Sequence, residues 1–464
     1  MVRRMKIKDT ISVFGPAMLT LRFTLIVLIG LGFTSCVDYT PAPVSMEQID
    51  HDFAARKLPA QKRAWTVQDF ILLSKKYQAG REQAAAQYAT AQAALITAGG
   101  SVNPAVSLVP GINTSAASNS PSGIPLVSFD LLWETAHKKD LRLLKAQQQV
   151  FKAGFALQDT EWQLDAAVRH AGWNLYFAQE RQKLLAQEVA AQEKVLDLVK
   201  HQLEAGLIAP TEVQSQDLVG RKARLDLADA DAAVLEARAQ LAEAVGVPAQ
   251  ALERAKMNLT VNPPSPRTAS QAVNRVRQVA LTHRPDVAMA LADYASEEAN
   301  LALEVAKQYP DIKVSPGYQW DQGNNKWQLG LGFDLPLFHQ NQGPIAEATA
   351  RRREAQSRLE MLQAKISAEV DRVVPALQQA WKTYQVAQDL VKTQEQKKTT
   401  AVRRAQAGQS EPMETLLAEV DLISAQLVLV DRANKLAQQL EALEALTRPP
   451  LVTAARATAE KNSK

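Results

Sequence analysis

Apolar and polar residues alternate with a period of two in two stretches of the second half of the chain. Around a Gly-Asn-Asn turn at 323–325, the apolar positions are Ile312, Val314, Pro316, Tyr318 and Trp320, then Trp327, Leu329, Leu331, Phe333, Leu335 and Leu337. This spacing predicts a β-hairpin over about 312–337 with one apolar face and one polar or small face. Another hairpin is predicted over about 103–133, around a Ser/Asn-rich loop, although Leu126 and Leu132 blur its alternation.

Helical spacing dominates the rest of the chain. Residues 135–205 contain no proline and few glycines, which predicts a helix of up to roughly 100 Å. A comparable helix follows the second hairpin, and we expect Pro375 to kink it or to mark a junction. Shorter return helices are predicted after Pro210 and Pro412. The apolar residues of these helices form narrow stripes, which indicates coiled-coil seams rather than a globular core.

The two hairpins belong to an internal duplication. Matching blocks recur in the same order at offsets of 206, 204 and 202: 86–95 with 292–301, 129–131 with 333–335, and 205–212 with 407–414. We therefore expect two structural copies, each with the order helix, hairpin, very long helix, turn and shorter helix. The predicted boundaries are a signal peptide at 1–35, a tether at 36–64, repeat 1 at 65–257, a proline-rich linker at 258–270, repeat 2 at 271–448 and a C-terminal tail at 449–464.

The strand count implies assembly. Two hairpins give four strands, whereas the smallest closed membrane barrels have about eight. Open strand edges are not tolerated in lipid, because their backbone groups would lack hydrogen-bond partners. The expected fold class is therefore mainly α with a membrane β-barrel portion that is closed only by further copies of the chain. The long helices would extend this barrel as a tube.

Composition and charge disfavour several functional classes. The formal charge of +4 comes entirely from the first 35 residues, so binding to a polyanion has no support. Six histidines are scattered without HExxH spacing, and no GxxxxGK phosphate loop is present. We therefore expect no catalysis, no cofactor and no metal site. His339 at the second strand-to-helix corner is compatible with a metal ligand, but a lone histidine beside a turn is more typical of a structural role.

The N-terminus resembles that of an exported lipoprotein. An apolar run at 23–33 is too short for a permanent transmembrane helix and is typical of a signal-peptide core. Its basic leader is long, so Met5 and Met18 are alternative start residues. Small residues precede Cys36, the only cysteine, as in a lipobox, and we expect Cys36 to carry the lipid, including palmitate. Phe33 departs from the usual lipobox, which leaves an ordinary secreted protein as the alternative.

Three passages resemble the TolC-like outer-membrane efflux factors, in a likeness that extends over about residues 65–448. They are HRPDVAMALADYASEEANLALEVAKQYPDI (283–312), FDLPLFHQNQG (333–343), and the paired turns EAGLIAPTE (204–212) and QAGQSEPME (406–414). The second passage is similar to the corner of CzcC-type heavy-metal efflux factors. The resemblance implies a lipid-anchored homotrimer in the outer membrane of a Gram-negative bacterium, with a twelve-stranded barrel and a twelve-helix periplasmic α-barrel. It also implies a passive exit duct for metal cations or small toxic compounds, docked on a periplasmic adaptor and an inner-membrane pump of the RND type.

The resemblance places the paired turns at the periplasmic tip. The positions that match adaptor contacts in the family are Gln202, Gly206, Leu207, Ile208, Arg404, Gly408, Gln409 and Ser410. The family usually has a basic residue where Gln202 stands. Glycine accepts the left-handed backbone angles that end a helix, and proline suits the first turn of the next one. The alternative is that these residues only end and begin helices.

Acidic residues just past the turns are candidates for a pore constriction repeated around the symmetry axis. They are Glu212, Asp217, Glu414, Glu419 and Asp421. Like charges brought together there would attract cations and respond to pH and salt. The alternative for each of them is an ordinary solvated charge on a helix surface.

Aromatic residues accompany the predicted strands. Trp133, Tyr318, Trp320 and Trp327 are expected to form girdles at the membrane interface. Core or equatorial packing is the alternative for Trp133. The competing interpretation of the whole chain is a lipid-anchored periplasmic coiled-coil adaptor or scaffold without a pore. Such a protein would not need two amphipathic hairpins at equivalent positions, and it would become soluble without its anchor at Cys36.

Overall fold

The computed structural model describes residues 39–59, 63–115, 122–253, 255–259 and 272–447. The predicted signal peptide, Cys36 and the predicted C-terminal tail lie outside these residues. The chain divides into two units, residues 1–55 and 56–464. The described part of the first unit contains helix α2 (Met46–Ala54), which begins after Ser45, whose hydroxyl oxygen accepts a hydrogen bond from the Gln48 backbone N–H. The segment predicted as a tether therefore contains a helix.

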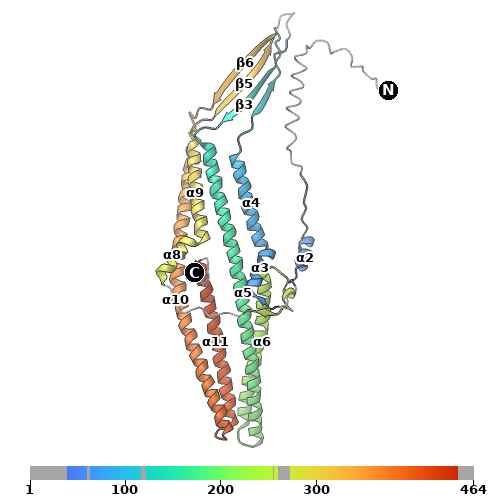
Figure 1. Cartoon of the computed structure of the whole chain (residues 1–464), viewed down its shortest axis with the longest axis vertical. Coiled ribbons are helices and arrows are strands. Elements are labelled where there is room, and N and C mark those ends of the chain that lie inside the picture. The colour runs from blue at the N-terminus through green and yellow to red at the C-terminus, as the bar shows by residue number, and fades with distance from the viewer. Residues whose placement is uncertain (1–38, 60–62, 116–121, 254, 260–271, 448–464) are drawn as a thin grey trace, which may run out of the picture. The chain divides into compact units, whose positions relative to one another are not determined.

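The second unit contains two copies of one element order (Figure 1). The first copy comprises α3 (Val67–Tyr77), α4 (Ala79–Gly99), β2 (Ala105–Val109), β3 (Leu126–Trp133), α5 (Lys138–Glu204) and α6 (Pro210–Val245). The second comprises α8 (Val273–His283), α9 (Pro285–Ala306), β5 (Ile312–Asp321), β6 (Asn324–Phe333), α10 (Gln342–Gln406) and α11 (Pro412–Thr447). The two hairpins and the two pairs of long helices occur in the same order, as the duplication predicts.

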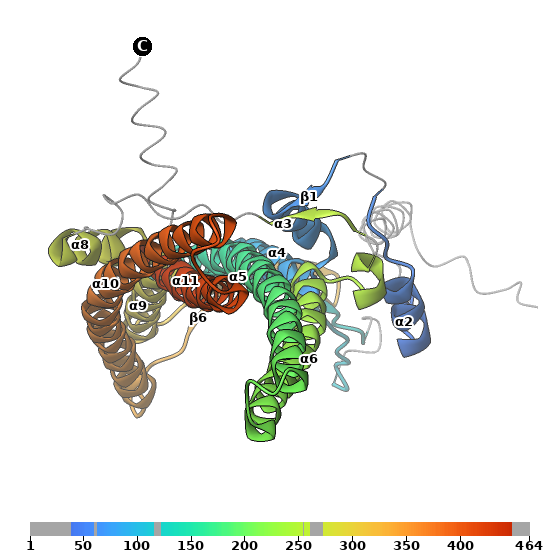
Figure 2. The same cartoon turned by 90° about the horizontal axis from the view of Figure 1, so that it is seen from below.

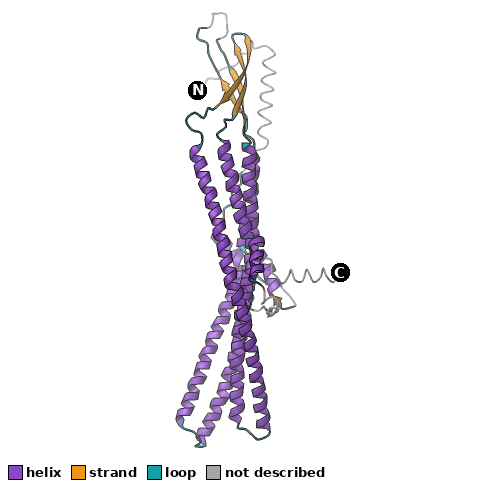
Figure 3. Ribbon diagram, turned by 90° about the vertical axis from the view of Figure 1, so that its left-hand side faces the viewer, coloured by secondary structure: helices purple, strands orange, loops and turns teal. Residues whose placement is uncertain are grey.

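The two hairpins form one antiparallel sheet in the order β2-β3-β5-β6. Figure 3 shows this sheet beyond one end of the long helices. Strands β5 and β6 are joined by Gln322 and Gly323, which both have positive φ, as a two-residue hairpin turn requires. Asp321 pairs with Asn324, so the prediction of a turn at 323–325 is wrong. Gln322 supplies the first turn residue, and Asn324 and Asn325 belong to β6.

The long helices pack as antiparallel pairs. Helix α5 has 67 residues and α10 has 65, which gives each a length of about 100 Å. Helix α5 packs on α6, α10 packs on α11, and α11 also packs on α5, which joins the two repeats (Figure 2). Pro375 lies inside α10, which continues as helix on both sides of it. Of the two expectations for Pro375, a junction between elements is therefore excluded, and a kink in α10 stays a prediction.

Two hydrophobic cores widen the coiled-coil seams. In the first repeat, Phe70 of α3 packs with Leu175 of α5 and Leu241 of α6. In the second, Val276 of α8 packs with Leu377 of α10 and with residues of α11. The short helices α3 and α8 thus cover the long pairs, and the prediction of thin seams alone is incomplete. The first core also includes η1 (Ala249–Leu252) and the paired parallel strands β1 (Trp65–Thr66) and β4 (Met257–Asn258).

Candidate functional site

One face of the sheet is apolar across all four strands. The strand register places Val314 opposite Leu331 and Leu131 opposite Val314, so apolar residues of β3, β5 and β6 share this face. In the same way Phe129 and Val106 continue it across β3 and β2. Its exposed members include Val106, Leu108, Phe129, Leu131, Trp133, Ile312, Trp327, Leu329, Leu331 and Phe333. An exposed apolar surface of this extent is not expected on a sheet that faces water on both sides.

The opposite face is polar and has its own hydrogen bonds. Asp130 of β3 accepts hydrogen bonds from the Ser107 hydroxyl at 3.1 Å and from the Ser315 hydroxyl at 2.6 Å. These contacts join β2, β3 and β5 through one carboxylate. Leu126 and Leu132 lie on this polar face, opposite Gln319 and Lys313. The irregular alternation of the first hairpin thus leaves the apolar face continuous.

The predicted interface aromatics lie near the two ends of the apolar face. Trp133 pairs with Ile312 at the helix end of the strands, and its side chain is 71% exposed. Trp327 lies near the hairpin turn, is 82% exposed and contacts the ring of Tyr318 at 5.0 Å between centroids. Trp320 is half-buried on the neighbouring part of β5. The core-packing alternative for Trp133 does not hold within the single chain.

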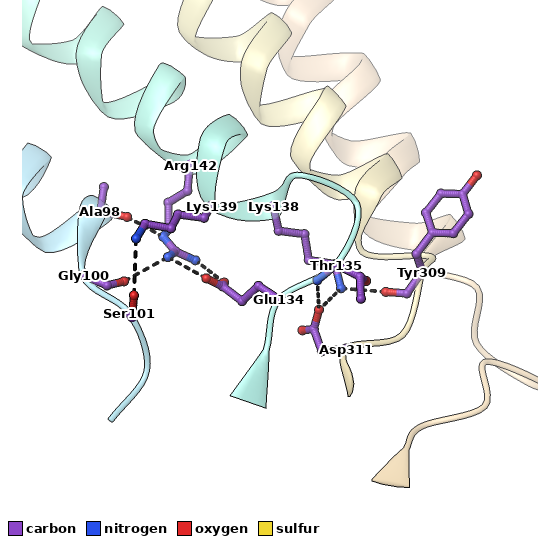
Figure 4. A network of polar contacts seen from close by, with 10 residues as sticks. All are labelled: Ala98, Gly100, Ser101, Glu134, Thr135, Lys138, Lys139, Arg142, Tyr309 and Asp311. Atoms are coloured by element: carbon purple, nitrogen blue, oxygen red, sulfur yellow. Dashed lines mark hydrogen bonds and ion pairs between the residues drawn. The ribbon is translucent and has the colours of Figure 1, made fainter. Parts of the chain in front are cut away.

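A buried lysine joins the two repeats where the strands meet the helices (Figure 4). Lys138 at the start of α5 donates hydrogen bonds to Asp311 Oδ1 and to the Tyr309 carbonyl oxygen, both at 2.6 Å. The backbone N–H of Thr135 also donates to Asp311, at 3.0 Å. Burial opposes ionisation of Asp311, but the hydrogen bonds from Lys138 and Thr135 outweigh it and lower the pKa of Asp311. The connection into α5 is thereby held against the connection into β5.

An arginine holds a third connection at the same level (Figure 4). Arg142 donates two hydrogen bonds to the Glu134 carboxylate, at 2.6 and 3.1 Å. It also donates to the carbonyl oxygens of Ala98 and Gly100, at the end of α4. The sequence analysis missed Glu134, Lys138, Arg142 and Asp311. One signal in the sequence could have identified them as junction residues: they are charged, and they stand directly beside strands whose exposed residues are apolar.

The paired turns have the same backbone geometry. Gly206 and Gly408 have φ values of 72° and 70°, in the region that favours glycine. The N–H of Leu207 donates to the Gln202 carbonyl and the N–H of Gln409 to the Arg404 carbonyl, each at 2.9 Å, as in a Schellman motif. Pro210 and Pro412 are the first residues of α6 and α11. Gly206, Leu207, Gly408 and Gln409 are exposed, and Gln202, Ile208 and Ser410 are half-buried.

Four of the five candidate constriction residues form ion pairs within the chain. Glu414 pairs with Arg404, Glu419 with Lys398, Asp421 with Lys397 and Asp217 with Arg221, at distances of 2.6 to 3.0 Å. No ion pair involves Glu212 within the part of the chain that the structure describes. Ion pairing accounts for four of these carboxylates as ordinary helix-surface charges. A role in a constriction stays a prediction for all five.

A charged cluster joins α5 to α11. His170 Nδ1 lies 2.8 Å from Glu441 Oε2, and Arg169 Nε lies 3.9 Å from Glu444 Oε2. The hydrogen bond with Glu441 raises the pKa of His170, although partial burial opposes this shift. Burial raises the pKa of Glu444, against the effect of Arg169.

Mild acid is therefore expected to stabilise the contact between α5 and α11. The protonated His170 contributes fully below the ordinary pKa of histidine, and this contribution is lost as the pH rises through its raised pKa. Ionisation of Glu444 also destabilises this contact as the pH rises, because the folded state disfavours the charged form of Glu444. The thermal unfolding midpoint in detergent should be a few degrees higher at about pH 6 than at about pH 8. His170→Gln should reduce this difference, and His201→Gln, at an exposed histidine, should retain it. An unchanged pH response in His170→Gln would contradict the assignment.

Two kinds of feature are not found among the described residues. None of the helices within them is both long and apolar enough to cross a bilayer. The same residues contain no group of three or more histidine, cysteine, aspartate or glutamate side chains placed to hold a metal ion. His339 is exposed.

Comparison with known proteins agrees with this geometry. Residues 276–447 match the family model described as "Outer membrane efflux protein". The predicted resemblance to the outer-membrane efflux family is confirmed. The cobalt-zinc-cadmium resistance protein CzcC of Cupriavidus metallidurans is 27% identical over 225 residues, which cover 48% of this chain and 52% of CzcC. The chain thus spans about half the length of this curated relative.

Solved structures of outer-membrane proteins share the fold. The outer membrane protein VceC of Vibrio cholerae superposes with a TM-score of 0.66 at 20% identity, covering 82% of this chain and 96% of VceC. The CmeC outer membrane channel of Campylobacter jejuni superposes with a TM-score of 0.64 at 13% identity, covering 91% of this chain and 97% of CmeC. At these identities the comparison concerns the fold alone, and it extends over both repeats.

Proposed function

We propose that the chain forms the outer-membrane exit duct of a tripartite efflux system. The observation that carries this proposal is the four-stranded sheet with one exposed apolar face, attached to helices of about 100 Å. Lipid outside and water inside is the environment that such two-sided strands require. The outer strands β2 and β6 each have one partner among the described strands, so further copies must pair with them. Three copies would give a twelve-stranded barrel with the helices as a periplasmic α-barrel.

The remaining parts of the proposal follow from this arrangement. Cys36 would anchor the chain to the membrane through its lipid, and the turns at 204–212 and 406–414 would face a periplasmic adaptor and an RND-type pump. We expect the duct to be passive, without catalysis, because the energy would come from the pump. The similarity to CzcC, whose name refers to cobalt, zinc and cadmium resistance, favours metal cations as the cargo over other small toxic compounds. The four-strand apolar face argues against a pore-free coiled-coil scaffold.

Export can be tested with a strain that lacks this gene. Loss of the duct is expected to lower the concentrations of cobalt, zinc, cadmium or antibiotics that stop growth, because the cargo stays in the cell. Growth should be measured across this panel, with the intact gene supplied in trans as the control for rescue. Accumulated metal should be measured in the same cells. Unchanged sensitivity and unchanged accumulation, in a strain without a related duct, would overturn the proposal.

A further inference from the structure

The two turns carry different side chains on the same backbone. The offset of 202 places Gln202 where the second turn has Arg404, and Glu212 where it has Glu414. The hydrogen bonds that close the two turns are equivalent, so these side chains start from equivalent positions. The two turns can therefore be compared directly. Both have the glutamate, but only the second has the arginine that can form an ion pair with it.

The second turn neutralises its own carboxylate. Arg404 Nη1 donates to Glu414 Oε1 at 2.8 Å, from the last turn of α10 to the first turn of α11. In the first turn, the neutral Gln202 stands in place of the arginine and cannot form an ion pair. Asp217, the next acid along α6, is already paired with Arg221. Within the described residues, the Glu212 carboxylate therefore has no ion-pair partner.

Glu212 lies at the edge of a groove between the two repeats. The groove has a volume of about 520 Å³, and its walls include Val199, Gln202, Ile208, Glu212, Val219 and Met413. Met413 belongs to the second turn, whereas the other five residues belong to the first repeat. The groove thus combines apolar side chains with the polar Gln202, Ser215 and Gln216 and with one exposed carboxylate. Its size suits a few side chains of a protein partner, and its charge suits a cationic one.

We propose that the first turn, rather than the second, accepts a lysine or arginine side chain from the periplasmic adaptor. This inference rests on the proposed function, which gives the turns an adaptor to contact. Glu212 pairs with the cation, and the apolar side chains of the groove receive its aliphatic stem. The second turn presents a carboxylate that Arg404 already neutralises, so it contributes shape rather than charge. The two turns of each protomer therefore have different roles in adaptor recognition.

Binding of the full-length duct in nanodiscs to the adaptor encoded beside its gene tests the proposal. Glu212→Gln is expected to weaken binding about three- to tenfold, because it removes one charge of the pair at each subunit. Gln202→Arg should weaken it similarly, since the new arginine reproduces the Arg404–Glu414 pair in the first turn. Glu236→Gln, at an exposed acid of α6 that does not line the groove, is the matched control, and Glu414→Gln is the control in the second turn. Both controls should change the affinity less than twofold.

Two further measurements make the outcomes distinct. An adaptor whose tip lysines and arginines are replaced with glutamine should bind wild type and Glu212→Gln equally, and raising the salt should weaken wild type more than this variant. Equal binding of Glu212→Gln and wild type to the unaltered adaptor would overturn the inference while leaving the duct function intact. Dissociation of the Glu212→Gln trimer on size exclusion would also overturn it, because the cation would then belong to a second copy. Absence of adaptor binding by wild type, together with unchanged export in the deletion strain, would overturn the proposed function as well.

Discussion

Arginine at position 329 is expected to prevent stable insertion of the duct into the outer membrane. Leu329 lies in the middle of β6 on the apolar face, opposite Pro316, and is 66% exposed. In a closed barrel this position faces the hydrocarbon core, where an arginine costs about 2–4 kcal/mol. The substitution occurs once in every copy, so its cost multiplies with assembly. We expect the membrane-integrated trimer to be lost almost completely.

The measurement should separate the sheet from the lipid anchor. All variants are therefore made with Cys36→Ala, and the membrane fraction is washed with carbonate and then extracted with detergent. The Cys36→Ala protein alone should remain in the membrane as a trimer, which a tethered scaffold would not do. Gln328→Arg is the matched control, because Gln328 is opposite Gly317 on the polar face of the same strand. Equal recovery of Leu329→Arg and Gln328→Arg would contradict a lipid-facing role for the apolar side.

The two hairpins could be predicted because the information for a strand is local. Alternation of apolar and polar residues identified the second hairpin, including the side chains that share its apolar face. The first hairpin was less clear, because Leu126 and Leu132 lie on its polar face. Their neighbours there, Gln319 and Lys313, come from the other repeat, and a single strand does not show which residues pair with it. The turn at 323–325 was wrong because Gln322 takes a positive φ that is uncommon for glutamine.

The site residues also divide into those that a local sequence pattern indicates and those that meet only in the folded chain. Glycine and proline identified the paired turns at 204–212 and 406–414, since each of these residue types acts through its own backbone. The ion pair of Arg404 with Glu414 spans only ten residues across a turn, and the departure at Gln202 was visible in the sequence. The contact of Lys138 with Asp311 joins residues 173 positions apart, and nothing local to either residue indicates it. Contacts between repeats therefore required the three-dimensional structure.

Replacing Asp311 with alanine is expected to loosen the junction between sheet and helices by about 2–3 kcal/mol. Removal of one member of a buried pair leaves the other charge without compensation, and this usually costs more than the pair contributes. The Lys138 side chain is only 8% exposed, and it would keep only the Tyr309 carbonyl as a hydrogen-bond acceptor. Because Asp311 is 29% exposed, water replaces part of the lost contact, so we place the cost below that of a fully buried pair.

Hydrogen exchange of the detergent-solubilised protein measures this loosening directly. Amides around 135–142 should exchange about 30- to 150-fold faster in Asp311→Ala, which corresponds to the expected free energy. Lys138→Met combined with Asp311→Leu removes both charges and should recover part of the protection. Asp140→Asn, which alters the exposed pair of His137 and Asp140 nearby, is the control and should change exchange little. Protection of 135–142 that is equal in Asp311→Ala and wild type would show that the Lys138 pair does not hold the two repeats together at this level.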